Sequence, residues 1–174
     1  MTVAIVLVSI LPALLVAAAV FDLASYTIPN FIPGTMLLLF AGLLAMLAVG
    51  GHPLTLSDAG FHMLAGFIGL AAGFLFFALG WVGGGDAKLF AVAALWLGWD
   101  MLFQYAVLAA VLGGCLTMML IWFRHIPLPA ILASQPWLAR LADVKEGVPY
   151  GVALALAALT VFPESELFRL VATS

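Results

Sequence analysis

Charged residues are scarce in this sequence. Asp, Glu, Lys and Arg make up only 7% of its 174 residues, whereas an ordinary soluble domain is about a quarter charged. Most of the uncharged segments are long enough for the roughly 20 residues that a helix needs to cross the hydrocarbon core of a bilayer. The sequence therefore predicts an integral membrane protein. The uncharged segments are residues 1–21, 23–57, 59–85, 101–123 and 147–163.

Cysteine and positive charge are also rare, and their scarcity excludes several classes of protein. A single cysteine, Cys115, cannot build a disulfide framework or a Cys-ligated zinc site. A net charge of -3 without any basic run argues against a nucleic-acid partner. Because no Lys or Arg precedes Lys88, the first apolar segment lacks the positive start of a secretory signal and is expected to remain as a helix.

Histidine offers no obvious metal site. His52 and His62 are predicted at the face of the membrane opposite the acidic pair described below, and His125 belongs to a polar loop. A zinc hydrolase needs several ligands in one place and is therefore poorly supported. We expect no metal and no cofactor.

Proline and glycine divide the apolar sequence into about six predicted helices. Pro29 and Pro33-Gly34 interrupt helical geometry after the first segment, and Gly50-Gly51 ends the second. Ser57 is the predicted N-cap of the third helix. The fourth helix has about twelve residues, or ~18 Å, which is short of the ~30 Å core, so it should pack among longer helices. We expect one all-α membrane domain, a polytopic bundle of about six transmembrane helices. Their predicted ranges are about 2–25, 35–49, 57–81, 86–97, 101–123 and 148–162.

The segment between the last two predicted spans is too polar to cross a membrane. After Pro136, apolar residues recur at helical spacing and the charged residues fall between them. This pattern is typical of a short helix, near residues 136–146, that lies on the membrane surface. The alternative is a solvated loop whose apolar spacing arose by chance. The apolar residues are Trp137, Leu138, Leu141 and Val144.

The few cations predict how the bundle is oriented. Positive residues favour cytoplasmic loops, and the loops after the first, third and fifth predicted helices hold Lys88, Arg124, Arg140 and Lys145. The opposite face carries Arg169. With six spans, both termini should therefore lie outside the cytoplasm.

Two of the eight acidic residues, Asp22 and Asp86, adjoin long apolar segments. Ionisable groups within a membrane are costly, which makes these two residues functional candidates. The predicted topology places both of them at the cytoplasmic end of the bundle. The other six acids are expected on the solvated surface: Asp58, Asp100, Asp143, Glu146, Glu164 and Glu166.

Two carboxyl groups that face each other cannot both ionise easily and therefore share a proton. One can deprotonate a water molecule while the other polarises a peptide carbonyl, and this chemistry needs no metal. Asp86 opens a predicted helix, where the positive end of the helix dipole favours a carboxylate, whereas Asp22 lies near the negative end of its helix. We hypothesise that the shared proton resides mainly on Asp22.

The residues around Asp86 allow two interpretations. Gly83, Gly84 and Gly85 either end one helix and permit close packing, or expose the backbone so that an extended substrate can approach Asp86. Lys88 lies two residues beyond Asp86 and faces elsewhere on the helix, as expected for a lysine that reaches the membrane surface.

Taken together, these elements resemble a known family. Asp22 with Ile28-Pro29-Asn30, and the run Gly-Gly-Gly-Asp-Ala-Lys from Gly83 to Lys88, are similar to the paired signature of the type IV prepilin peptidases, whose second half is the GxGD motif. Val148-Pro149-Tyr150-Gly151 is similar to a proline-containing segment that opens the last helix in that family. The resemblance extends from Asp22 to Gly151.

The resemblance implies an aspartyl endopeptidase of the bacterial inner membrane, with Asp22 and Asp86 as its catalytic pair. Such an enzyme removes the short basic leader of prepilins at the cytoplasmic membrane face, for type IV pilus assembly and protein secretion. Its substrate would present an apolar N-terminal helix in the bilayer. Residues that would bind substrate or support the motifs are Ile28, Pro29, Asn30, Gly83, Gly84, Gly85, Lys88 and Pro149.

One departure from the family concerns its second activity. Members that also methylate the new N-terminus carry paired cysteines in an added cytoplasmic segment. With one cysteine and little chain before Asp22, N-methyltransferase activity is not expected here. The size resembles that of the minimal enzymes of tight-adherence (Flp-type) pili, and archaeal preflagellin peptidases are a second match.

Two other functions remain open at this stage. A small membrane transporter or proton relay could use the same two acids, although a relay should distribute ionisable groups through the depth of the membrane. A purely structural membrane subunit would tolerate Asp22→Asn and Asp86→Asn.

Overall fold

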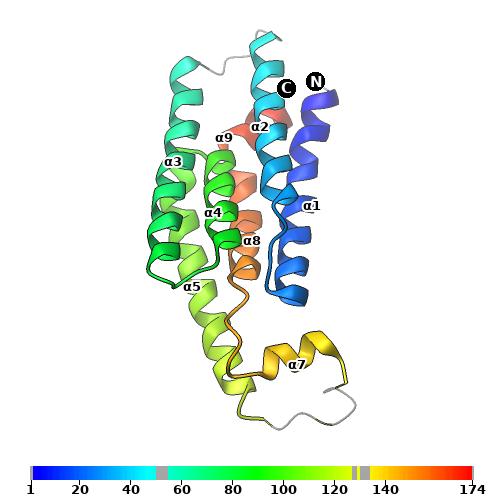
Figure 1. The fold of residues 1–174 in the computed structure, drawn as a ribbon. Helices are drawn as coiled ribbons and strands as arrows, with labels where there is room; N and C mark the ends of the chain where they lie inside the picture. Colours follow the sequence, from blue (N-terminus) through cyan, green and yellow to red (C-terminus); the bar gives the residue numbers. More distant parts are fainter. Residues whose placement is uncertain (1, 50–54, 127–128, 130–133, 174) are drawn as a thin grey trace.

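The computed structural model describes residues 2–49, 55–126, 129 and 134–173, and its regular structure there is helical throughout. The long helices stand side by side as a bundle, with one short helix across its lower end (Figure 1). This arrangement confirms the predicted all-α membrane bundle. The helices are α1 (Thr2–Ser25), α2 (Phe31–Val49), α3 (Leu56–Ala78), α4 (Gly84–Leu97), α5 (Trp99–Phe123), α7 (Pro136–Ala142), α8 (Tyr150–Val161) and α9 (Glu166–Thr173), with a 3-10 turn, η1 (Phe162–Glu164).

Within the described residues, four helices are long and apolar enough to cross a membrane: α1, α2, α3 and α5. The segment from α8 to α9, bent by 50°, gives a fifth span if it is counted as one. The chain is therefore a multi-pass membrane protein with four or five candidate spans, where the sequence predicted about six. The difference lies in α4, which has only 14 residues and packs among the longer helices, as its predicted length indicated.

Three predicted helix boundaries need correction. Helix α2 begins at Phe31 and not at Thr35, because Pro33 falls in the first turn, where its missing N–H has no intrahelical partner. The cap of α3 is Thr55 and not Ser57, since Thr55 and Asp58 form reciprocal hydrogen bonds between side chain and backbone. Helix α3 also ends before Trp81, at Ala78.

The polar segment before α8 contains a helix, but a shorter one than predicted. Helix α7 covers Pro136–Ala142, and Asp143 ends it in an extended conformation. Its Leu141 is buried against the rest of the protein, whereas Trp137 is 41% exposed. A helix with one buried and one exposed apolar side chain agrees with the amphipathic pattern rather than with a solvated loop.

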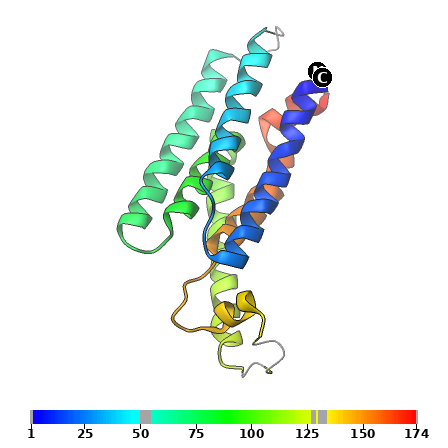
Figure 2. The same cartoon turned by 45° about the vertical axis from the view of Figure 1, so that its right-hand side comes forward.

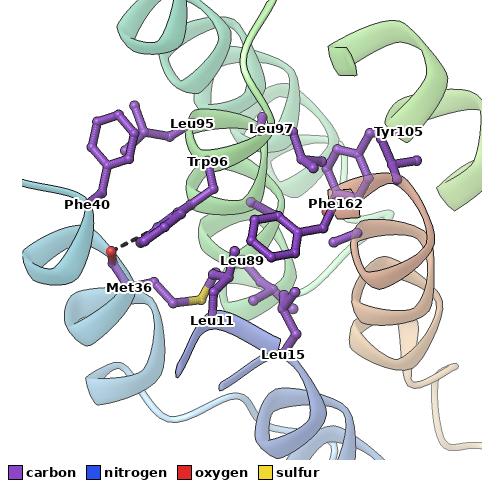
Figure 3. Close-up of a cluster of buried hydrophobic side chains, with 14 of the residues drawn as sticks. Leu11, Leu15, Met36, Phe40, Leu89, Leu95, Trp96, Leu97, Tyr105 and Phe162 are labelled. Carbon is purple, nitrogen blue, oxygen red and sulfur yellow. Dashed lines mark hydrogen bonds between the residues drawn. The ribbon is translucent and has the colours of Figure 1, made fainter. Parts of the chain in front are cut away.

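Helix α4 forms the centre of the bundle. Eight of its 14 residues are buried, and Trp96 donates a hydrogen bond from its indole nitrogen to the backbone carbonyl of Met36 on α2, at 3.0 Å. Figure 3 shows this bond and the side chains from α1, α2, α5 and η1 that surround α4. The core therefore holds the short helix in place although α4 cannot span the membrane by itself. Labelled members of the cluster are Leu11, Leu15, Phe40, Leu89, Tyr105 and Phe162.

Glycines on α3 allow α4 to approach it closely. A Cβ atom at Gly66, Gly69 or Gly73 would come within about 3.0 Å of atoms on α4. Membrane helices associate through such small residues because lipid supplies no hydrophobic driving force between them. This contact runs along α4 toward its first turn, where Gly73 lies against Ala87, and so helps to fix the start of α4.

The bundle has two distinct ends. Both chain termini lie at the upper end in Figure 1, whereas α1 ends, and α4 and α8 begin, toward the lower end (Figures 1 and 2). Three helix ends that are far apart in the sequence are thereby brought together, and each carries residues that the sequence analysis selected.

Candidate active site

Asp22 lies in the last turn of α1 and is only 3% exposed. Its Oδ2 accepts a hydrogen bond of 2.6 Å from the backbone N–H of Gly151, the second residue of α8. This contact joins residues 129 positions apart in the sequence. A buried carboxyl group needs such a donor, because removing it from water is costly.

Asp86 lies in the first turn of α4, facing the same place. Its Oδ2 accepts a hydrogen bond of 3.2 Å from the backbone N–H of Gly83, which precedes the helix. Its Oδ1 is buried and has no hydrogen-bond partner in the described part of the chain. The carboxyl of Asp86 also lies within electrostatic range of that of Asp22. The structure thus brings Asp22 and Asp86 to the same end of the bundle, where α1 ends and α4 and α8 begin.

Two glycines make this approach possible. A Cβ atom at Gly151 would lie 2.8 Å from Oδ2 of Asp22 and 2.7 Å from Cδ1 of Ile28. A Cβ atom at Gly85 would lie 3.1 Å from Cβ of Ile28. Ile28 is itself buried and packs between the starts of α4 and α8. The glycine at 85 therefore serves close packing, the first of the two interpretations above.

The other glycines of the run have looser surroundings. A Cβ atom at Gly84 would meet only the ring of Phe77, at an ordinary 3.5 Å. Gly83 caps the helix with an extended backbone and gives its N–H to Asp86. Its backbone N–H binds Asp86, and a Cβ atom at this position would lie only 3.1 Å from Oδ2 of Asp86.

The Ile-Pro-Asn element forms the turn between α1 and α2. The carbonyls of Pro29 and Asn30 accept the first backbone hydrogen bonds of α2. The side-chain oxygen of Asn30 also accepts a hydrogen bond of 2.8 Å from Nζ of Lys88. Lys88 therefore does more than reach toward the membrane surface, because it ties this turn to α4. Pro149 occupies the position before α8 and thereby precedes the Gly151 amide by two residues.

Sequence reasoning gave no role to Arg124, which holds the chain that leads into α8. Its Nε donates to the carbonyl of Leu141 at 3.0 Å, and its Nη2 donates to the carbonyl of Gly147 at 2.7 Å. These bonds anchor the segment just before Pro149 and Gly151. The sequence signal was weak, because one arginine at the end of a span is normally explained by the charge of cytoplasmic loops.

Tyr26 is a second residue that the sequence did not single out. It ends α1 with a positive φ of 54°, a conformation that costs a residue with a side chain about 1–2 kcal/mol. Burial raises the pKa of the Tyr26 phenol, although the Arg124 guanidinium beside it acts in the opposite direction. The phenol lies close enough to Asp22 and Arg124 for their charges to act on it. Such backbone strain is common at functional sites.

An apolar cavity of about 210 Å³ opens beside Asp86. Helices α3, α4, α5 and α8 all contribute to it, mostly through small side chains. The cavity is large enough for one large apolar side chain, and Asp86 lies on its wall. Its lining includes Gly73, Phe76, Ala106, Ala109, Gly113 and Tyr150.

Comparison with known proteins agrees with the motifs and the geometry. The family model described as "Type IV leader peptidase family" matches residues 9–118, a range that contains Asp22 and Asp86. The chain belongs to the type IV leader peptidase family. A curated relative, a prepilin leader peptidase/N-methyltransferase from Pectobacterium carotovorum subsp. carotovorum, is 34% identical over 136 residues. No solved structure gives a significant match.

The match covers 75% of this chain but only 47% of the relative, so the chain spans about half the length of that type IV leader peptidase. Membership in the family confirms the resemblance drawn from Asp22, the Ile-Pro-Asn element and the GxGD motif. Gly151 lies beyond the matched range, although its amide contacts Asp22.

Proposed function

We propose that this chain is an aspartyl endopeptidase that removes the leader from type IV prepilins, with Asp22 and Asp86 as its catalytic pair. The observation that carries the proposal is that the two carboxyl groups lie within electrostatic range of each other, at the point where the Gly151 amide donates to Asp22. Two carboxyls so close cannot both ionise easily, which is the arrangement that aspartic proteases use. The peptidase family of the chain supports the same chemistry.

Asp86 is suited to act as the base. The Gly83 N–H and the positive end of the α4 dipole favour negative charge on its carboxyl. Its Oδ1 is a buried acceptor without a partner in the described chain, and such atoms in proteins are normally satisfied by water. In the proposed reaction this oxygen takes a proton from water as the water oxygen attacks the peptide carbonyl.

Asp22 is suited to hold the shared proton. It lies near the negative end of α1, and it is almost completely buried. Its proton is donated to the carbonyl oxygen as the tetrahedral intermediate forms. As the intermediate collapses, the proton on Asp86 passes to the leaving amine and the C–N bond breaks. Asp22 takes back a proton from a hydroxyl of the intermediate as the new carboxyl group forms. Both carboxyls end the cycle ready to bind another water.

The substrate class follows from the surroundings of the pair. The apolar cavity beside Asp86 would hold the side chain of a residue next to the cleaved bond, and an apolar N-terminal helix would pack against the exposed faces of the spans. Lys88 and Arg124 lie at the same end as the pair, which favours a cytoplasmic location for this end. We therefore propose cleavage at the cytoplasmic face of the bacterial inner membrane.

The test is to co-express a Flp-type prepilin with the wild-type chain, Asp22→Asn or Asp86→Asn. Leader removal is followed by gel shift and by mass spectrometry of the new N-terminus. Each variant should lose at least about 10³-fold in cleavage rate, since it removes a proton donor or acceptor of the reaction. Asp143→Asn is the matched control, because this exposed acid lies on the α7 side of the same end, and should cleave normally.

Full cleavage by either aspartate variant would refute the proposal. The proton relay is tested in the same strains. If the chain is a relay, the two aspartate variants should change proton flux in vesicles and should leave the cleavage of prepilins unchanged. Elution volume and melting temperature of the purified variants show whether a loss of cleavage comes from misfolding.

A further inference from the structure

A second and larger cavity, of about 540 Å³, lies at the opposite end of α4 from the aspartates. It is formed where α4 gives way to α5, between the first turns of α3 and the segment η1–α9. Charged residues are concentrated here, although the chain has very few. We call this cavity the His62 pocket, and its lining includes His62, Trp99, Asp100, Glu164, Glu166 and Arg169.

His62 is an unusual wall residue, because it is only 1% exposed and one ring nitrogen lacks a hydrogen bond. Its Nδ1 lies 2.8 Å from the carbonyl oxygen of Leu95. A carbonyl can only accept, so Nδ1 carries a hydrogen, and in this tautomer Nε2 presents a lone pair. Nε2 has no hydrogen-bond partner among the described residues, and Oε2 of Glu166 lies 3.7 Å away, too far for a hydrogen bond.

The position of this ring is built into the backbone. Gly98, between α4 and α5, has a φ of +80°, and a Cβ atom there would lie 2.8 Å from Cε1 of His62. The glycine therefore leaves room for the imidazole against the helix junction. Phe40 packs on the same ring, with centroids 5.9 Å apart. The imidazole that lines the cavity is therefore held in one position by its neighbours.

These groups define the chemistry of a ligand. Nε2 of His62 and the Glu166 carboxylate are both acceptors, so the ligand must donate hydrogen bonds, and a nitrogen could lie within hydrogen-bond distance of both. Asp100 and Glu164 on the same cavity favour a positive charge. Among the described residues no three His, Cys, Asp or Glu side chains are grouped as metal ligands, so an organic cation fits better than a metal ion.

The location of the pocket indicates where that cation comes from. It lies at the ends of the spans α3 and α5, and exposed Phe61 and Trp99 border it. Tryptophan at the end of a transmembrane helix is normally found at the level of the lipid head groups. The lining also contains Arg169, so both signs of charge are present, as a zwitterionic head group with a phosphate and an ammonium requires.

We propose that the His62 pocket binds the primary ammonium group of an aminophospholipid head group, such as that of phosphatidylethanolamine. The ammonium donates to Nε2 of His62 and to Glu166, and the acyl chains lie against the apolar surface of α3 and α5. This site is independent of the proposed peptidase chemistry, so either proposal can fail without the other.

The first experiment compares head groups on the purified wild-type protein. Dioleoyl phosphatidylethanolamine, phosphatidylcholine and phosphatidylglycerol are offered in equal amounts, and retained lipid is counted by native mass spectrometry. Phosphatidylethanolamine should be retained about tenfold better than phosphatidylcholine, because a trimethylated nitrogen cannot donate the hydrogen bonds. Equal retention of these two lipids would overturn the proposal without any mutation.

The second experiment locates the site. Glu166→Gln keeps the shape of the side chain and removes its charge, so the preference for phosphatidylethanolamine should fall toward that for phosphatidylcholine. Glu146→Gln is the control at the other end of the bundle and should keep the preference. The ¹⁵N resonance of Nε2 of His62 should move when phosphatidylethanolamine is added to wild type.

The result also separates two sources of the ammonium. Ethylammonium chloride supplies the same group without a lipid. If it moves the His62 resonance as strongly as the lipid does at equal concentration, the cation is a soluble amine and the lipid assignment is wrong. An unchanged lipid preference in Glu166→Gln would likewise overturn the site.

Discussion

The two ends of α4 are built alike and yet support different chemistry. At each end a glycine lies against a buried titratable side chain: Gly151 against Asp22, and Gly98 against His62. At the first end the neighbouring acid is Asp86, which lies within electrostatic range of Asp22. At the second end the neighbouring acid is Glu166, whose side chain is 48% exposed and lies 3.7 Å from the imidazole.

The difference shows that enclosure, more than residue type, determines what an acid can do here. Asp22 is almost completely enclosed, and the carboxyl of Asp86 lies within electrostatic range of it. The acids near His62 surround a cavity that is open to a ligand. The first end is suited to reaction and the second to recognition, and the following predictions test this contrast.

The largest effect is expected from Gly151→Ala. The new Cβ atom would clash with Asp22 and Ile28, and the start of α8 would have to move away from the acidic pair. Displacement of a catalytic group by about 1 Å costs on the order of 100-fold in rate. We expect a loss of that size in prepilin cleavage, measured as initial rates on purified substrate. Gly114→Ala is the control, since nothing lies within 4 Å of its Cβ position; equal rates for the two variants would show that the close contact at Gly151 is unimportant.

The next effect concerns the apolar cavity beside Asp86. In the proposed peptidase reaction, Ala106→Leu should fill part of this cavity. Prepilins with alanine after the cleaved bond should then be preferred over those with a large apolar residue there. We expect about a tenfold loss with a large apolar residue there and little change with alanine, in line with the discrimination that apolar pockets achieve. The measurement is kcat/KM on two prepilins that differ at that position. Val107→Leu, on the exposed side of α5, should leave both values unchanged; a uniform loss on both prepilins would argue against a side-chain pocket.

At the opposite end, Gly98→Ala should reduce stability. Alanine is strained at a φ of +80°, and its Cβ atom would press on the His62 ring. A strained residue of this kind costs about 1–3 kcal/mol, which should appear as a lower melting temperature in detergent. Gly42→Ala on α2 has open space around it and should be neutral or slightly stabilising, because alanine is the better helix former. Identical melting temperatures would show that the ring adjusts freely.

The smallest effect is expected at the Lys88–Asn30 hydrogen bond. Both side chains are at least partly exposed, and surface interactions of a charged group typically contribute no more than about 1 kcal/mol. Lys88→Met should therefore lower the cleavage rate by at most about fivefold, by loosening the turn between α1 and α2. Lys145→Met serves as the control for loss of a cation near the same end. A loss as large as that of Gly151→Ala would mean that Lys88 contacts the substrate directly.

Much of the helix pattern was readable because apolar composition and helix-breaking residues act locally. The ends of α1 and α4 agreed closely with prediction, since Pro29 and Gly98 interrupt the chain at those points. The start of α2 was misplaced because Pro33 is tolerated in a first turn, and the cap of α3 because Thr55 and Ser57 are both good capping residues.

The acidic pair was predicted from its cost in a membrane, but its partners were not. The Gly151 amide lies 129 positions beyond Asp22 in the sequence, and no pattern along the chain predicts such a contact. Arg124 and Tyr26 were missed for the same reason, because their importance comes from carbonyls and side chains brought together by folding.

The sequence by itself determined that the chain enters a membrane, that its helices break at glycine and proline, and that Asp22 and Asp86 are the acids to suspect. These properties depend on the cost of placing each residue in lipid and on local backbone geometry. The tertiary structure alone decided that the Gly151 amide donates to Asp22, that a cavity opens beside Asp86, and that His62 lines a second cavity. Those features depend on how closely helices pack, and packing is a property of the whole bundle.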